Sequence, residues 1–192
     1  MTLSATSVST AQVSPTAVKR WKIDASHSSV GFSVRHMMIT NVKGEFAKFE
    51  GEVQYNPKQP EASKASVSID VASIATRDEK RDAHLRSADF FDAEQFPTIT
   101  FQSRRTTLKG SSLEVAGELS IHGKTRDVTL TVSDITEEHT DPWGNRRIGA
   151  SATTKVKRSD FGMQWNGVLE AGGVLVGDEI TIHIEVSLVR TK

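Results

Sequence analysis

Hydrophobic and polar residues alternate along several segments of the chain. Residues 30–34, 67–71, 128–132 and 180–188 carry Val, Ile, Leu or Phe at every second position, and residues 115–121 follow the same phase. A period of two predicts β-strands with one face toward an apolar interior and the other toward water. It also favours antiparallel pairing, because parallel strands are usually apolar on both faces.

Short polar segments separate these strands. Residues 56–60, 109–112, 122–124 and 141–145 contain Gly, Pro, Asn, Asp or Ser in turn-forming combinations. Short links between successive strands predict hairpins and a meander. With about eight or nine strands the fold is all-β, either a sandwich or a closed barrel. Eight strands would form a barrel whose interior is filled by side chains or holds a ligand.

One segment departs from the alternation. Thr76–Glu79 matches a capping box and predicts a helix over about residues 77–86, almost wholly charged. A second short turn over residues 88–95 stops at Pro97 and brings three rings that need an apolar partner: Phe90, Phe91 and Phe96. We therefore expect a helical insertion at about residues 77–95 that covers one end of the barrel.

Composition and charge narrow the class of protein. The 192 residues contain 24 Lys and Arg, 24 Asp and Glu, and no Cys. The balanced charge predicts no nucleic-acid partner, and no apolar run is long enough for a transmembrane segment. We expect a disordered Ser- and Thr-rich tail at residues 1–19, then a single domain over residues 20–190. Since the tail shows no secretory signal, the expected location is the cytoplasm.

Residue patterns typical of catalysis or metal binding are not evident. The six histidines are scattered without metal-ligand spacing, and no nucleophile or phosphate-binding motif is found. The sequence therefore predicts a protein that is not an enzyme and uses no metal or cofactor. One polar run has two interpretations, a solvated helix face or a site for a polar head group. It comprises Arg77, Asp82, His84, Arg86 and Asp89.

Several motifs in order resemble the YceI-like family, also called polyisoprenoid-binding proteins. The resemblance covers about residues 21–188. The motifs are WKIDASHS at 21–28, VGFSVRHMM at 30–38, GEF at 44–46, FEG at 49–51, SIAT at 73–76, RDAHLRSADFFD at 81–92, FPTITFQS at 96–103, GELSIHGKT at 117–125 and RSDFGM at 158–163.

This resemblance implies an extended eight-stranded antiparallel β-barrel, lipocalin-like in shape. It implies that a long isoprenoid or similar amphiphilic lipid occupies an apolar interior, with helices near the opening. The protein would then be a carrier, store or sink without catalysis, and homodimers are common in the family. The alternative is a stress-related or interaction module with a filled barrel and no physiological lipid.

Candidate site residues follow from the alternating faces and the helical insertion. The predicted ligand-binding residues are Phe32, Val34, Phe46, Ile69, Leu85, Phe90, Phe91, Phe101, Leu119, Ile121, Leu130, Phe161, Ile182 and Ile184. The predicted polar head-group residues are Arg35, Arg77, His84 and Arg158. The last group has a second interpretation, because a buried Asp–Arg pair that locks the helix to the barrel would also account for Arg158.

Overall fold

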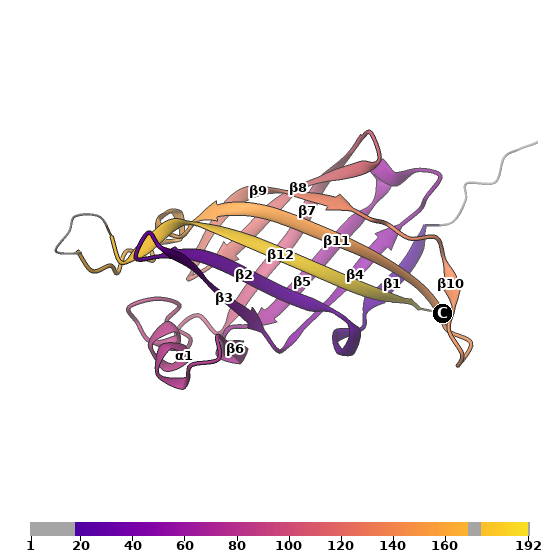
Figure 1. The fold of residues 1–192 in the computed structure, drawn as a ribbon. Coiled ribbons are helices and arrows are strands. Elements are labelled where there is room, and N and C mark those ends of the chain that lie inside the picture. The colour runs from indigo at the N-terminus through magenta and orange to yellow at the C-terminus, as the bar shows by residue number, and fades with distance from the viewer. Residues whose placement is uncertain (1–17, 169–173, 192) are drawn as a thin grey trace, which may run out of the picture.

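The computed structural model describes residues 18–168 and 174–191, and it is dominated by antiparallel strands (Figure 1). Residues 1–17 of the predicted tail lie outside the described residues. The strands are β1 (Lys19–Ile23), β2 (Ser29–His36), β3 (Thr40–Phe46), β4 (Phe49–Tyr55), β5 (Lys64–Asp70), β6 (Ile74–Ala75), β7 (Thr98–Lys109), β8 (Ser112–Ile121), β9 (Lys124–Ser133), β10 (His139–Thr140), β11 (Arg146–Lys157) and β12 (Val176–Arg190).

The strands form a closed eight-stranded barrel, as the resemblance implied, and the sandwich is ruled out. β1 and β2 together form one bent strand that pairs along one edge of β12. In the same way, β3 and β4 form a second bent strand, and β5 and β6 form a third. β7, β8, β9 and β11 continue the meander. The barrel closes because β12 pairs with β11 on one side and with β1 and β2 on the other.

Each bend in the first three strands coincides with a local break in pairing. The 3₁₀ turn η1 (Ala25–His27) separates β1 from β2, and η3 (Val71–Ser73) separates β5 from β6. The carboxylates of Asp24 and Asp70 cap these turns by accepting bonds from the amides of Ser26 and Ala72. The remaining 3₁₀ turns are η2 (Pro60–Ala62) and η4 (Arg158–Phe161).

The predicted helix is present, but its start differs from the capping-box prediction. α1 spans Glu79–Arg86, and Asp78 caps it by accepting a bond from the Arg81 amide at 3.0 Å. Thr76 is buried, and both its amide and its hydroxyl donate to Asp82. Thr76 therefore anchors the helix to the end of β6 instead of capping it. Among the described residues, no helix is both long and apolar enough to cross a membrane.

The two ends of the barrel are built differently. We call one end the floor, where Trp21, Ile23, Ile148 and Leu188 form a separate buried cluster. The opposite end, which we call the mouth, carries α1, η4 and the β2–β3 turn (Figure 1). The larger apolar cluster extends from the barrel centre to the mouth.

Candidate functional site

The barrel encloses an apolar cavity of about 180 Å³. That is more than ten times the roughly 10–15 Å³ that a single water needs on the same measure. Its walls are almost entirely hydrocarbon, and Gly31, Thr154 and Arg158 are the exceptions. The sequence left open whether the interior is filled or hollow, and the structure shows that part of it is hollow.

Opposite walls of the barrel differ in how tightly they pack. Along β8, Leu113 to Ile121, every second residue is buried against the core. Along β12, Ile180, Ile182 and Ile184 line the cavity yet are only partly buried. Their exposed surface faces empty space inside the barrel, so the β2–β12 wall has apolar area available for a ligand.

Two phenylalanines fill the interior only because glycines lie opposite them. The Phe32 ring occupies the position that a side chain at Gly44 would need, with a ring carbon 2.4 Å from an ideal Cβ there. Phe101 covers Gly117 in the same way, at 2.7 Å. These close approaches set the shape of the cavity, because any larger residue at either glycine would displace the ring.

The structure brings together all but one of the predicted ligand-binding residues. Phe161 is the exception: it is 1% exposed and packs within the core cluster. The residues that line the cavity are Phe32, Val34, Phe46, Ile69, Leu85, Phe90, Phe91, Phe101, Leu119, Ile121, Leu130, Ile182 and Ile184. Their role in binding stays a prediction, but their placement around one cavity is what that role requires.

Of the predicted head-group residues, only Arg158 lines the cavity, and its guanidinium is already occupied. It donates to the carbonyls of Gly177 at 3.0 Å, Met163 at 2.7 Å, Trp165 at 2.8 Å and Val176 at 3.4 Å. Burial lowers the pKa of Arg158 from its usual value. Arg158 therefore ties together two segments of the mouth and offers the ligand its hydrocarbon stem.

The other three predicted head-group residues lie outside the cavity. Arg35 and Arg77 are exposed, and the Arg35 Nε donates to the Met38 carbonyl. His84 pairs with Asp89 at 2.9 Å and stacks edge-on against Phe90 and Trp165. His84 contacts Phe90, and Phe90 lines the cavity, so His84 lies one residue away from the cavity wall.

The helix lock has a different composition from the expected Asp–Arg pair. Asp82 binds Thr76, and Arg81 donates to the Thr76 hydroxyl and carbonyl at 2.7 Å each. The buried Asp and a neighbouring Arg thus meet on one threonine, while Arg158 binds carbonyls elsewhere. The spacing of these residues in the sequence does not distinguish an Asp82–Thr76–Arg81 cluster from a direct pair between an aspartate and Arg158.

Sequence reasoning missed about half of the cavity wall. Most of these residues continue the alternating faces by one step, so the same periodicity could have found them. Thr154 and Met163 carried no such signal. The missed residues are Ile23, Val30, Gly31, Val67, Ile99, Val128, Thr154, Val156, Met163, Val176, Ile180 and Val186.

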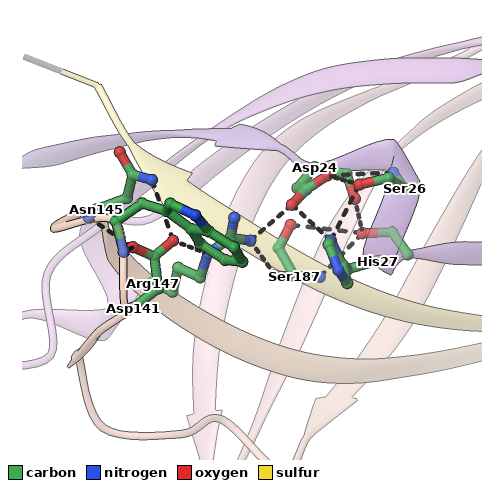
Figure 2. A network of polar contacts seen from close by, with 9 residues as sticks. Asp24, Ser26, His27, Asp141, Asn145, Arg147 and Ser187 are labelled. Carbon is green, nitrogen blue, oxygen red and sulfur yellow. Dashed lines mark hydrogen bonds and ion pairs between the residues drawn. The ribbon is translucent and has the colours of Figure 1, made fainter.

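A dense polar network lies at the floor end, outside the barrel (Figure 2). Arg147 is at its centre and donates to Asp24 at 2.6 Å, to Asp141 at 2.7 Å and to Ser187 at 3.2 Å. These bonds join η1, the turn before β11, and β12. Glu138 makes a second ion-pair cluster nearby with Lys19, Arg146 and Arg190.

The floor carboxylates titrate below their ordinary range. Bonds from Ser26 and Arg147 hold the pKa of Asp24 far below its usual value. The Arg147 bond lowers the pKa of Asp141 to about 2, and the Lys19 bond lowers that of Glu138 to about 2. Since each shift favours the charged form, these groups stabilise the fold at neutral pH.

Ser26, His27 and Asp24 lie in contact in Figure 2 but lack the geometry of a catalytic triad. A triad uses both ring nitrogens of the histidine, one toward the acid and one toward the nucleophile. Here Nδ1 of His27 contacts both the Ser26 hydroxyl at 3.0 Å and Asp24 at 2.9 Å. The Ser26 hydroxyl also bonds to Asp24 at 2.6 Å, so the three side chains cap η1. Within residues 18–168 and 174–191, no group of three or more metal-ligating side chains was found.

Comparison with known proteins assigns the family. The model of the YceI-like domain matches residues 21–188. The chain belongs to the YceI-like family. A UPF0312 protein of Vibrio cholerae serotype O1 is 40% identical over 143 residues, which cover 74% of this chain and 75% of that protein.

Solved structures share the YceI-like barrel. Burkholderia cenocepacia BcnA superposes with a TM-score of 0.76 at 26% identity, covering 86% of this chain and 98% of BcnA. A polyisoprenoid binding domain from Saccharophagus degradans, implicated in plant cell wall breakdown, has a TM-score of 0.65 at 15% identity and covers 91% and 100% of the two chains. The second likeness concerns the fold alone.

Proposed function

We propose that this YceI-like protein binds a long-chain isoprenoid or similar amphiphilic lipid in the barrel and acts as a carrier, store or sink without catalysis. The observation that carries this proposal is the lining of the cavity. The lining is almost entirely hydrocarbon. Its one charged residue, Arg158, donates its hydrogen bonds to backbone carbonyls of the protein. Such a lining suits an apolar chain and has no free charged group to hold a polar substrate.

The energetics favour retention of an apolar chain. Each methylene that leaves water contributes about 0.8 kcal/mol. The partly buried β12 isoleucines supply surface that a ligand would cover. The structural neighbour from Saccharophagus degradans is a polyisoprenoid binding domain, which supports the isoprenoid as the ligand class. The polar end of such a ligand would remain near the mouth, where His84 and Asp89 lie.

Native mass spectrometry of the purified protein, followed by organic extraction, tests this proposal. We expect a discrete added mass that resolves to an isoprenoid or a related lipid, or uptake of an added polyprenol. A bare mass combined with no polyprenol uptake would overturn the proposal in favour of an interaction module. The same spectrum reports whether the protein is a homodimer.

A matched pair of substitutions locates the ligand. Leu119→Trp adds volume to the cavity wall and should displace about two methylenes, which corresponds to roughly tenfold weaker retention of polyprenol. Leu108→Trp is the control, because Leu108 is 47% exposed at the β7–β8 turn. Equal retention by both variants would show that the ligand does not occupy the barrel interior.

A further inference from the structure

The mouth end carries an exposed apolar surface beside the cavity. We call it the tip: the hairpin of residues 35–43 together with residues 163–168 and 174–176. Its most exposed side chains are Val168 at 90%, Ile39 at 74% and Met38 at 59%. Met37 and Val174 belong to the same group. Outside the tip, the exposed large apolar residues in the described part of the chain are Val18, Leu108 and Trp143.

Backbone contacts make the tip one continuous surface. The Met37 amide donates to the Leu175 carbonyl at 2.8 Å, and the Leu175 amide donates to the Gly167 carbonyl at 2.8 Å. Val168 and Val174 form an isolated antiparallel bridge. The β2–β3 turn and the segment before β12 lie side by side at the same end in Figure 1. The exposed apolar residues of the two segments therefore lie at the same end of the barrel.

The hairpin keeps methionines where backbone geometry disfavours them. Met37 and Met38 have φ values of 50° and 58°, and the Ile39 amide closes the turn on the His36 carbonyl. Two positive φ values are typical of a type I′ turn, which favours Asn-Gly. Methionines at these positions reduce stability, and both side chains remain exposed. A contact with a partner outside the chain would account for their presence.

The charges of the tip all have one sign. The hairpin carries Arg35 and Lys43 and no carboxylate, and the described residues 163–168 and 174–176 are uncharged. In the described part of the chain, the nearest acidic residues in sequence are Glu45 on β3 and Asp160, Asp178 and Glu179 beside the other two segments; Asp178 and Glu179 bind Ser159 and Lys155. Glu170, between those two segments, falls outside the described residues. An apolar tip flanked by cations complements a surface of anionic lipids.

The cavity reaches this surface. Met163 and Val176 belong to the tip and line the cavity, and Val34, next to the tip in the chain, lines it as well. From these observations we propose that the tip docks on an anionic lipid surface, with Met37, Met38, Ile39 and Val168 at the headgroup level. Docking would turn the mouth toward the bilayer, so that a lipid enters the barrel without crossing water. The inference rests on the proposed function, because it assigns the surface from which that ligand comes.

Vesicle flotation tests the docking directly. The full chain should float with phosphatidylcholine vesicles that contain phosphatidylglycerol, and less with phosphatidylcholine alone. Arg35→Gln and Lys43→Gln should each weaken binding by about fivefold, since one cation near an anionic surface is worth about that factor. Added salt should weaken binding as well. Equal binding to both vesicle types would overturn the role of charge.

The double variant Met37→Asn, Met38→Gly separates docking from folding. It installs residues that the turn prefers, so the fold should be at least as stable, while vesicle binding should fall by roughly tenfold or more. Trp143→Ser is the matched control, because Trp143 is 79% exposed in the turn between β10 and β11 at the floor end. Unchanged binding by the double variant, or an equal loss in the control, would overturn the proposal.

Three outcomes distinguish the docking from the proposed function. Polyprenol uptake from detergent without vesicle binding would overturn the docking and leave the lipid-binding function in place. Vesicle binding without polyprenol uptake would support the docking and overturn the function. A dimer that the double variant converts to a monomer, with vesicle binding unchanged, would show that the tip is an interface with a second copy and would overturn the docking.

Discussion

The floor and the mouth of this barrel satisfy their polar groups in opposite ways. At the floor, charged side chains pair with one another: Arg147 bridges Asp24 and Asp141, and Glu138 collects three cations. At the mouth, Arg158 bonds to four backbone carbonyls, and the tip exposes apolar side chains. The floor network joins residues far apart in the chain, such as Arg147 and Asp24. The carbonyls that Arg158 binds all lie within 19 positions of it.

The apolar interiors of the two ends differ as well. Trp21 is 1% exposed and fills the floor, while the β2–β12 wall near the mouth borders empty space. The floor is therefore densely packed, whereas free volume borders the β2–β12 wall. This contrast indicates that packing is concentrated at one end and that space for the proposed ligand lies toward the other.

The largest expected effect comes from emptying the floor. Trp21→Ala should lower the free energy of unfolding by about 3–5 kcal/mol, because it removes a fully buried ring. Chemical denaturation measures the change. A loss below 1 kcal/mol would show that the floor does not carry the stability assigned to it.

Trp21→Phe is the control for this substitution. The Trp21 Nε1 is buried and has no hydrogen-bond partner among the described residues. Replacing the indole by a phenyl ring removes that unpaired donor and keeps most of the apolar area. We therefore expect Phe to cost much less than Ala, about 1.5 kcal/mol or below.

A smaller and more local effect is expected at the mouth. Arg158→Met keeps the apolar stem but removes the bonds donated to the carbonyls of Met163, Trp165 and Gly177. The Val176 carbonyl keeps its bond from the Asn166 side chain. We expect a loss of about 2 kcal/mol, within the range for hydrogen bonds to a charged group. Hydrogen exchange should accelerate for the amides around Val176 and stay unchanged at Ile148. Uniform acceleration at both ends would contradict the separation of floor and mouth.

The smallest effect is a dependence of floor stability on pH. Glu138 and Asp141 have pKa values lowered to about 2, from ordinary values of 4.5 and 3.8. The stabilisation is therefore complete above about pH 4.5 and is lost as the pH falls toward 2. Melting temperatures measured between pH 6 and pH 2 should decrease in that window.

Arg147→Gln tests the source of this dependence. It removes the partner of Asp24 and Asp141, so their pKa values should return toward the ordinary range and the acid-induced loss should become shallower. Lys155→Gln is the control, because Lys155 pairs with Glu179 on the exposed surface away from the floor. A profile that Arg147→Gln leaves unchanged would place the acid sensitivity elsewhere.

The periodicity of the sequence predicted most of the barrel and most of one site. Alternation on β8, β9 and β12 identified inward residues such as Leu119, Leu130 and Ile182, because the pleat fixes which face each side chain takes. The charged helix was also foreseen. Its N-cap was not, since both Thr76 and Asp78 suit that position and only tertiary contact with Asp82 decides between them.

Features that depend on distant contacts were beyond local patterns. The pairing of β12 with β1 joins residues about 170 positions apart, such as Trp21 and Arg190. The Arg147 network and the carbonyl partners of Arg158 likewise have no spacing signature. The tip has no local signature either, because Met37 and Met38 occupy a turn that normally favours Asn-Gly.

The seam formed by the last strand has a consequence for how the chain folds. The strands of the meander pair with strands close to them in sequence, but β12, besides pairing with β11, must also find β1 and β2 across the whole domain. During synthesis the earlier strands can assemble only as an open sheet with an unpaired edge. Ring closure waits for β12 to leave the ribosome, and such long-range contacts set a slow folding step. The pairing of β12 therefore determines when the barrel closes and its interior cavity forms.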